Sequence, residues 1–390
     1  MTCLEFIVLH NLNKNIKSKT TIMKQIILSI VITLTAIAAT AQMDAPFPGG
    51  NIRATISEDV GITSIIIKYW RPGVKGREGK IWGGVVANGF GTFSFITYKN
   101  TSPWRAGANN ATVISFEHDV KVEGKDLKAG SYALFIAMGM DSVTLIFSTQ
   151  TEAWGSFYYK EEDDVLRVKV KPVILDKSVE WLKYEFIEHQ EKSCVVALQW
   201  EKLSVPFKVE VDVDNIALAR LRQEVTGPKG FMSHTLIQAS SYCFEHDINL
   251  EEALGWAKRA ITGIYGLTGY IALENLANGY EKLNRLPQAD SAMNEALKFA
   301  NVNQYIAYGR TLITQKRMDR ALDIMLAARA KFGDVYSVND GLSYAYSAKG
   351  DYPKALEYAN KALLQAPAPP LKTSINANIE KLKAGKDINQ

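Results

Sequence analysis

Small residues recur at a spacing near 34 residues through the last third of the chain. Each unit has one alanine followed seven residues later by another: Ala253 and Ala260, Ala289 and Ala296, Ala321 and Ala328, and Ala355 and Ala362. A large side chain stands nine residues before the first alanine of each unit, namely Phe244, Tyr280, Leu312 or Tyr346. Such a period predicts stacked pairs of helices. Alanine is expected where the helices touch, because a bulkier side chain would push them apart.

This pattern resembles the tetratricopeptide repeat. The alignment predicts four repeats at 234–269, 270–301, 302–335 and 336–369, with a helical linker at 215–233 and a capping helix and tail at 370–390. The resemblance implies a groove lined by the first helix of each pair, and a protein or peptide partner held there. The groove positions carried over from the family are Glu274, Asn278, Glu281, Asn303, Arg310, Asp340 and Tyr344. The alternative is an array that only packs against the rest of the chain.

The N-terminal segment has the features of an export signal. Lys24 is followed by an uncharged and mainly apolar run from Ile26 to Ala39, interrupted by single hydroxyl residues at 29, 33 and 35. This run is too short to span a bilayer, and small residues follow it. We expect a signal peptide within residues 1–41, cleavage after Ala41, and translation from Met23. We therefore expect a periplasmic or secreted protein that has no membrane span once the signal peptide has been cleaved.

The charge balance gives no reason to expect a nucleic-acid partner. The chain has a formal net charge of +4, but residues 1–41 hold four lysines and one glutamate, so the remainder is close to neutral. Two cysteines remain after the leader, Cys194 and Cys243. We expect two separate buried thiols, with an interdomain disulfide as the alternative.

Residues 42–214 alternate short β-rich runs with turns and lack helical spacing. The runs lie at 62–70, 92–98, 112–116, 132–138, 142–148, 166–173, 182–189, 194–201 and 207–214. Several alternate apolar and polar residues, as half-buried strands do. The pattern predicts an antiparallel β-sandwich or a flattened barrel, and therefore a two-domain chain of β and then α structure.

Ordered motifs in this region resemble the exported bacterial family called domain of unknown function 2911. They are Tyr69-x-Arg71-Pro72-x-Val74-Lys75-Gly76-Arg77, Ile81-Trp82-Gly83-Gly84, Trp104 to Thr112, Leu127-x-Ala129-Gly130-x-Tyr132, Trp154-Gly155 and Asp164 to Val168. The likeness implies the fold of residues 44–214 and lends no biochemical activity.

Cationic, amide and tryptophan side chains crowd the first of these motifs, and they fit an anionic or carbohydrate ligand. The candidate ligand-binding residues are Arg71, Lys75, Arg77, Trp104, Arg105, Asn109 and Asn110. A structural interpretation is also open: the arginines pair with Glu78, Glu117 or Asp119, the tryptophans fill the core, and Gly107 and Asn109 form a turn.

Known catalytic and metal-binding spacings are missing from the sequence. The histidines are isolated, and there is no G-x-S-x-G or G-x-x-x-x-G-K motif. We therefore expect no catalytic residues, metal or cofactor, and a non-catalytic envelope protein that binds partners through its repeats. The alternative is an envelope hydrolase acting on glycans or peptides around Arg71 and Trp104, with Glu117 or Asp119 as the acid. A purely structural assembly module is a third interpretation.

Overall fold

The computed structural model describes residues 50–92, 101–139 and 141–390. The expected leader and cleavage site, and all but the first residue of the expected strand at 92–98, lie outside this part of the chain. The chain divides into two compact units, one comprising residues up to Glu58 with Ser64–Glu210 and the other Asp59–Thr63 with Val211–Gln390.

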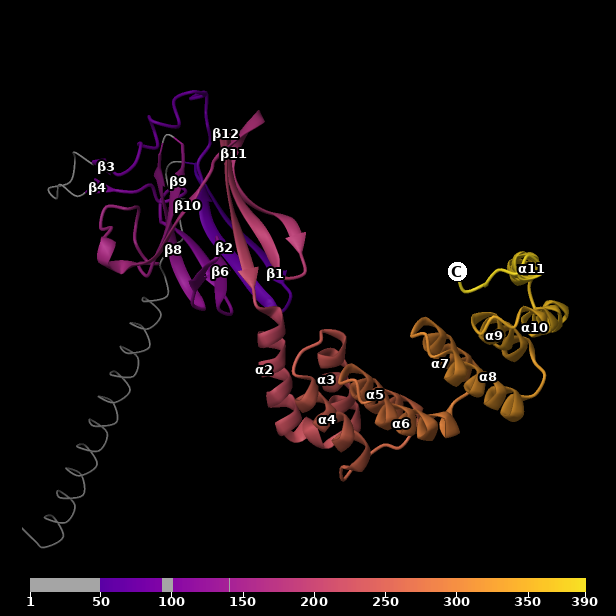
Figure 1. Cartoon of the computed structure of the whole chain (residues 1–390). Coiled ribbons are helices and arrows are strands. Elements are labelled where there is room, and N and C mark those ends of the chain that lie inside the picture. The colour runs from indigo at the N-terminus through magenta and orange to yellow at the C-terminus, as the bar shows by residue number, and fades with distance from the viewer. Residues whose placement is uncertain (1–49, 93–100, 140) are drawn as a thin grey trace, which may run out of the picture. The chain divides into compact units, whose positions relative to one another are not determined.

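The first unit contains two larger antiparallel sheets and a small one (Figure 1). In spatial order, the six-stranded sheet consists of β1 (Ile52–Val60), β2 (Thr63–Arg71), β5 (Thr112–Phe116), β8 (Gly130–Met138), β9 (Val143–Ser148) and β10 (Asp164–Val170). The four-stranded sheet consists of β11 (Val173–Gln190), β12 (Ser193–Val211), β6 (Val120–Val122) and β7 (Lys125–Leu127). The small sheet pairs β3 (Gly91–Thr92) with β4 (Thr101–Ser102), and a short 3₁₀ helix, η1 (Glu161–Asp163), precedes β10.

The two larger sheets pack face to face through aromatic side chains. The ring of Phe147 on β9 lies 6.2 Å from that of Phe207 on β12, and the ring of Tyr69 on β2 lies 4.8 Å from that of Tyr184 on β11. Alternation sets the buried face of strands such as β5, whose first, third and fifth residues are buried. The expected antiparallel sandwich is confirmed.

Some strands differ from those expected. The runs at 194–201 and 207–214 belong largely to one strand, β12, despite Pro206 between them. The last registered pair with β11 is Val173 with Ser204, so the missing N–H of Pro206 removes no rung from that pairing. β1, β6 and β7 were not expected: β1 is mostly exposed, and β6 and β7 are three residues each.

The second unit is helical, and Figure 1 shows its helices following one another as adjacent pairs. It begins with α2 (Val213–Thr226) and the 3₁₀ helix η2 (Pro228–Phe231). The pairs are α3 (Ser233–Glu245) with α4 (Leu250–Thr262), α5 (Tyr270–Lys282) with α6 (Leu286–Phe299), α7 (Val302–Thr314) with α8 (Met318–Phe332), and α9 (Tyr336–Ala348) with α10 (Tyr352–Gln365). The last helix is α11 (Pro369–Lys383). The expected tetratricopeptide-like array is confirmed.

Close helix contacts explain the repeated small residues. All eight of the aligned alanines have an exposed fraction of 0%. Glycines add to the effect, since a Cβ on Gly309 of α7 would lie 2.5 Å from Cε of Met325 on α8. At the end of the array, α11 covers the alanines of α10 with Ile375, Ile379 and Leu382, as a solenoid end requires.

Cys194 and Cys243 are both free and buried. Burial raises the pKa of each thiol to about 11, so both stay protonated near neutral pH. No helix within the described ranges is both long and apolar enough to cross a bilayer.

Adjacent alanines on α8 provide a matched test of the packing. Ala328 is fully buried and Ala327 is exposed. We expect Ala328→Leu to lower the free energy of unfolding by about 1–3 kcal/mol, because added bulk forces the helices apart. Ala327→Leu should change it by less than about 0.5 kcal/mol. Urea unfolding of the full chain measures both, and equal effects would contradict the close-contact assignment.

Candidate functional site

A cavity of ≈ 400 Å³ lies within the β unit. One wall is the loop after β2, which includes Arg77 and Gly84 to Ala87, and a second is the segment from Ser102 to Ala108. That segment is fixed to β8 by two backbone hydrogen bonds, from Trp104 N to Ile136 O (2.8 Å) and from Ile136 N to Trp104 O (2.7 Å). Asn51, Ser156 and Trp200 complete the polar and aromatic lining.

Three tryptophans form a cluster beside this cavity. The ring of Trp82 lies 5.7 Å from that of Trp104 and 5.9 Å from that of Trp200, both edge to face. Trp104 stacks on Trp200 at 6.0 Å. Trp200 is 1% exposed, whereas Trp104 is half-buried. The cluster is therefore partly core, and two of its members also line the cavity.

The two arginines of the lining are held by backbone carbonyls. Nε of Arg77 donates to Val74 O (2.9 Å) and its Nη2 to Gly73 O (2.7 Å), while Nη1 of Arg105 donates to Asn109 O (2.8 Å). Within the described residues, neither guanidinium has a carboxylate within ion-pair distance. Arg77 and Arg105 therefore do not form the alternative pairs with Glu78, Glu117 or Asp119.

Burial shapes the setting of Arg105. Its guanidinium lies over the rings of Trp154 (6.0 Å) and Phe157 (5.7 Å), and desolvation lowers its pKa below the ordinary value. A Cβ on Gly155 would lie 2.7 Å from Nη1 of Arg105, so the glycine of the Trp154-Gly155 motif leaves room for this side chain. Arginine remains charged despite such a shift.

The other predicted β-unit residues lie outside the cavity lining. Nε of Arg71 donates to Leu182 O (2.8 Å), and Nζ of Lys75 lies 5.7 Å from the ring of Trp181, so both contact β11. Asn109 forms the expected turn with φ of 57° and supplies the carbonyl that holds Arg105. Asn110 is exposed and bridges to Trp154.

The acids named for the hydrolase alternative are not in the cavity lining. Glu117 and Asp119 follow the last residue of β5, whereas the Arg105 segment meets its first residue through Thr112 N and Arg105 O (3.2 Å). Glu117 accepts from Ser64 N, and Asp119 accepts from Lys128 and Ala129 N. The described lining contains no carboxylate.

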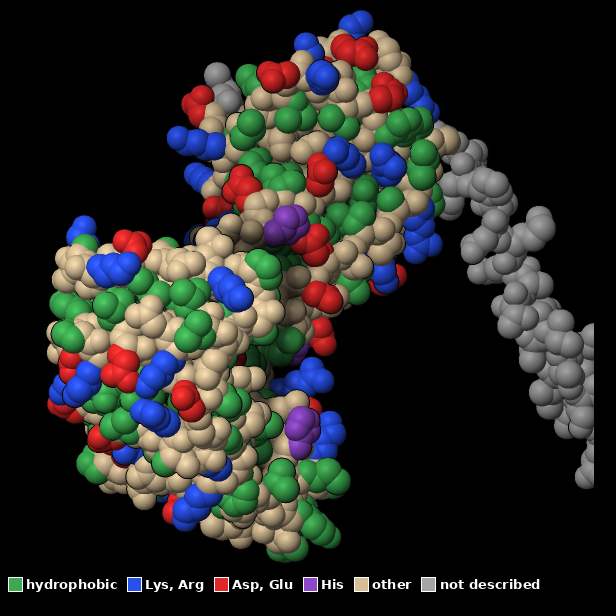
Figure 2. Space-filling model, turned by 90° about the vertical axis from the view of Figure 1, so that its right-hand side faces the viewer, with side chains coloured by type: hydrophobic (Ala, Val, Ile, Leu, Met, Phe, Trp, Pro, Cys, Tyr) green, Lys and Arg blue, Asp and Glu red, His purple; other side chains and the backbone are tan. Residues whose placement is uncertain are grey.

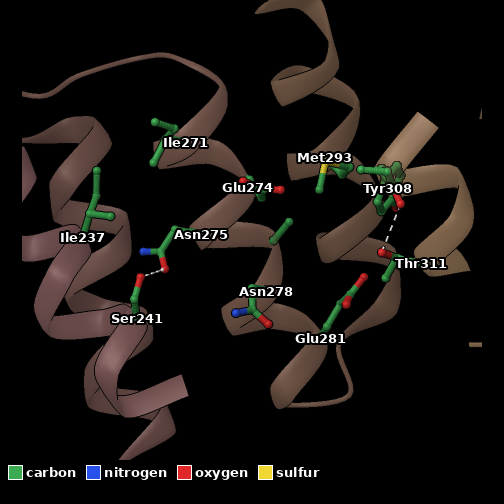
Figure 3. A pocket seen from close by; sticks show the side chains of 12 residues that line it. Ile237, Ser241, Ile271, Glu274, Asn275, Asn278, Glu281, Met293, Tyr308 and Thr311 are labelled. Atoms are coloured by element: carbon green, nitrogen blue, oxygen red, sulfur yellow. Dashed lines mark hydrogen bonds between the residues drawn. The ribbon is translucent and has the colours of Figure 1, made fainter. Parts of the chain in front are cut away.

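A second hollow, of ≈ 330 Å³, lies among the helices (Figure 3). Its side chains come chiefly from α3, α5 and α7, the first helices of three pairs. Of the predicted groove residues, Glu274, Asn278 and Glu281 line it. The lining also includes residues that the repeat pattern did not predict, namely Ile237, Ser241, Ile271, Asn275, Tyr308 and Thr311.

Buried polar contacts hold this hollow in shape. Oγ of Ser241 on α3 donates to Oδ1 of Asn275 on α5 (2.8 Å), and Nδ2 of Asn275 donates to Oγ of Ser240 (2.7 Å). Asn275 is 7% exposed, so these bonds fix α3 against α5. By contrast, Asn278 is exposed and available to a ligand.

The remaining groove predictions lie further along the array. Nη2 of Arg310 pairs with Oδ2 of Asp340 (2.5 Å), and the Arg310 guanidinium lies 4.2 Å from the ring of Tyr344. The Tyr344 hydroxyl accepts from Nδ2 of Asn378 on α11 (3.0 Å). Arg310 therefore contacts the other two predicted residues, Asp340 and Tyr344. Asn303 is exposed at the start of α7, outside the lining of this hollow.

Comparisons with known proteins agree with the motifs of the β unit. A family profile described as Protein of unknown function (DUF2911) matches residues 52–209. Residues 52–209 are a DUF2911 domain. No curated protein matches the chain at a significant level.

Solved structures similar to this chain include several helical-repeat proteins. Pseudomonas aeruginosa pilF is 20% identical, covering 39% of this chain and 69% of that one, with a TM-score of 0.29. YrrB, described as a TPR protein with an unusual peptide-binding site, is 15% identical, covering 43% and 85%, with a TM-score of 0.29. TTC0263, a TPR protein of Thermus thermophilus, is 18% identical, covering 44% and 95%, also at 0.29.

Apolar side chains gather beside the helical hollow. Ile271 lines the hollow and is 66% exposed, and the nearby connection from α4 to α5 exposes Ile264, Tyr265 and Leu267. Met232, also exposed, bridges to Tyr265. Figure 2 shows hydrophobic side chains on the visible face, with charges of both signs interspersed among them. Exposed apolar patches commonly mark interaction surfaces.

The Arg310 cluster gives a pH-dependent prediction. Burial raises the pKa of Asp340 above its ordinary value, and Arg310 opposes that rise. Arg310→Gln should lower the free energy of unfolding by about 1–3 kcal/mol near neutral pH, because a buried carboxylate loses its charged partner. A carboxyl whose pKa is raised in the folded state binds its proton more readily when the chain is folded. Protonation of Asp340 removes the unpaired charge, so the decrease in unfolding free energy caused by Arg310→Gln should become smaller as the pH falls towards about 4.

Urea unfolding of both proteins at the two pH values measures this difference. Arg222→Gln is the control, because Arg222 pairs with the less buried Glu252 on the same unit, and a solvent-exposed ion pair contributes little to stability. A loss for Arg310→Gln that is no larger than the control's, or that does not change with pH, would contradict the assignment.

Proposed function

We propose that this chain is an exported, non-catalytic binding protein whose helical repeats hold a protein or peptide partner in the groove. The hollow among α3, α5 and α7 carries the proposal. Its volume of ≈ 330 Å³ is at the lower end of the range for ligand sites. It is lined by first helices, where arrays of this kind present their ligand-binding face.

The chemistry of the lining favours a peptide with both apolar and basic side chains. Ile237 and Ile271 offer an apolar surface at one side, and the exposed apolar connection beside Ile271 extends it. Glu274 supplies negative charge that favours lysine or arginine, whereas Glu281 already accepts from Nε2 of Gln315 (3.0 Å) and lies 3.9 Å from Nη1 of Arg317. The Asn278 amide can donate to and accept from a peptide backbone.

Export and lack of catalysis are part of the same proposal. The apolar run from Ile26 to Ala39, followed by small residues, supports export through a cleaved signal peptide. The absence of nucleophile, phosphate-loop and zinc motifs from the sequence supports binding without catalysis. The interleaved charges favour protein partners over nucleic acid.

Two matched alanines test the groove. Ala307 lines the hollow and Ala327 is exposed on α8, so a new arginine fits on the surface at either position. We expect Ala307→Arg to reduce capture of the partner from an envelope extract by about tenfold or more, because its side chain fills the hollow. Ala327→Arg should capture it as the unmodified chain does, as measured by quantitative mass spectrometry.

Thermal unfolding of both variants separates blockage from misfolding. If both variants keep the same partners at the same level, the groove is not the binding surface and the proposal fails. If the unmodified chain captures nothing above a no-bait control, the binding function itself is contradicted.

A further inference from the structure

We propose that the cavity of the DUF2911 domain binds a small organic anion, in which a carboxylate or phosphate group is attached to a flat ring. The anionic group is placed between Arg77 and Arg105, and the ring against Trp104. This site lies in the β unit and is independent of the helical groove. It adds a small-molecule ligand to the proposed protein partner.

The positive charge of the cavity lining has no counter-charge among the described lining residues, and this supports binding of an anion. Arg77 and Arg105 both line the cavity, and the described lining contains no aspartate or glutamate. A guanidinium has five N–H donors. Arg77 directs two donors to carbonyls and Arg105 one, which leaves N–H groups on each without a protein acceptor among the described residues. A half-buried cation without a counter-ion is costly, and a bound anion would offset that cost.

The arginines are also fixed in position before any ligand arrives. The loop that holds Arg105 turns through Ala106 and Asn109, with φ of 52° and 57°. The Ala106 carbonyl accepts from Oγ1 of Thr112 (2.9 Å) and from the hydroxyl of Tyr184 (2.9 Å), both within the core. A rigid pair of donors loses little entropy on binding, which favours affinity for a small ligand.

An unpartnered buried donor gives independent support. Nε1 of Trp200 is buried without a hydrogen-bond partner, and Trp200 lines the cavity while 1% exposed. Buried donors are usually satisfied. Nε1 of Trp104, in contrast, donates to Gly107 O (3.1 Å). The buried hydroxyls of Ser102 and Ser156, 3.2 Å apart in the same lining, can add hydrogen bonds to an oxygen-rich group.

Size and lining select the ligand class. The volume of ≈ 400 Å³ suits a small molecule rather than a polymer. The lack of carboxylates in the described lining disfavours metal cations and basic ligands. The tryptophan rings favour a flat partner over an aliphatic one.

The test uses the full chain, with tryptophan fluorescence and calorimetry as readouts. The probes are benzoate, phenyl phosphate, inorganic phosphate and the uncharged benzyl alcohol. We expect saturable binding of benzoate or phenyl phosphate, weaker binding of inorganic phosphate, and none of benzyl alcohol. Arg105→Gln should weaken binding of the ring-bearing anion by about tenfold or more, through loss of a charge-assisted hydrogen bond.

Arg53→Gln is the matched control, because Arg53 is an exposed arginine of β1 outside the cavity lining. It should bind as the unmodified chain does. If Arg105→Gln strongly lowers the melting temperature, binding of the same probes to Arg77→Gln is measured in its place. The proposal is overturned if neither ring-bearing anion binds saturably at millimolar concentration, or if the folded cavity variant binds as tightly as the control.

Discussion

Contact between helices at alanine is the constraint on which the helical unit depends. The eight aligned alanines are completely buried, and this allows each second helix to lie close against the first helices beside it. Because a single pair cannot bury its apolar surface alone, the pairs stack and α11 covers the last of them. Stacking also aligns α3, α5 and α7, so the hollow among them is a consequence of the same contacts.

The DUF2911 domain follows a different principle, in which loops are fixed by a rigid sandwich. Its motif residues have different roles. Arg71 links the end of β2 to β11 by a hydrogen bond, Gly155 leaves space for the Arg105 side chain, and Arg105 lines the cavity. Backbone carbonyls hold the two cavity arginines in place of carboxylates. Positive charge is therefore left for a ligand to neutralise.

Local patterns predicted the fold well because each reflects a local physical cause. The alternation in Thr112 to Phe116 marks β5 to the residue, and the alanine period marks the helix pairs. The sites were predicted less completely, since they depend on contacts between distant residues. Nothing in the run around Trp200 distinguishes it from a core strand, and the contact of Arg310 with Asp340 and Tyr344 becomes evident only when α7 and α9 lie together.

Site-specific photo-crosslinking in the producing cell can show whether the first helices of the repeats contact a partner. A benzophenone side chain would replace exposed Asn278 in the hollow or, as the comparison, exposed Ala327 on α8. The account predicts a discrete light-dependent adduct with another protein from position 278 and none from position 327. Adducts of equal yield from both positions, or none from position 278, would contradict it.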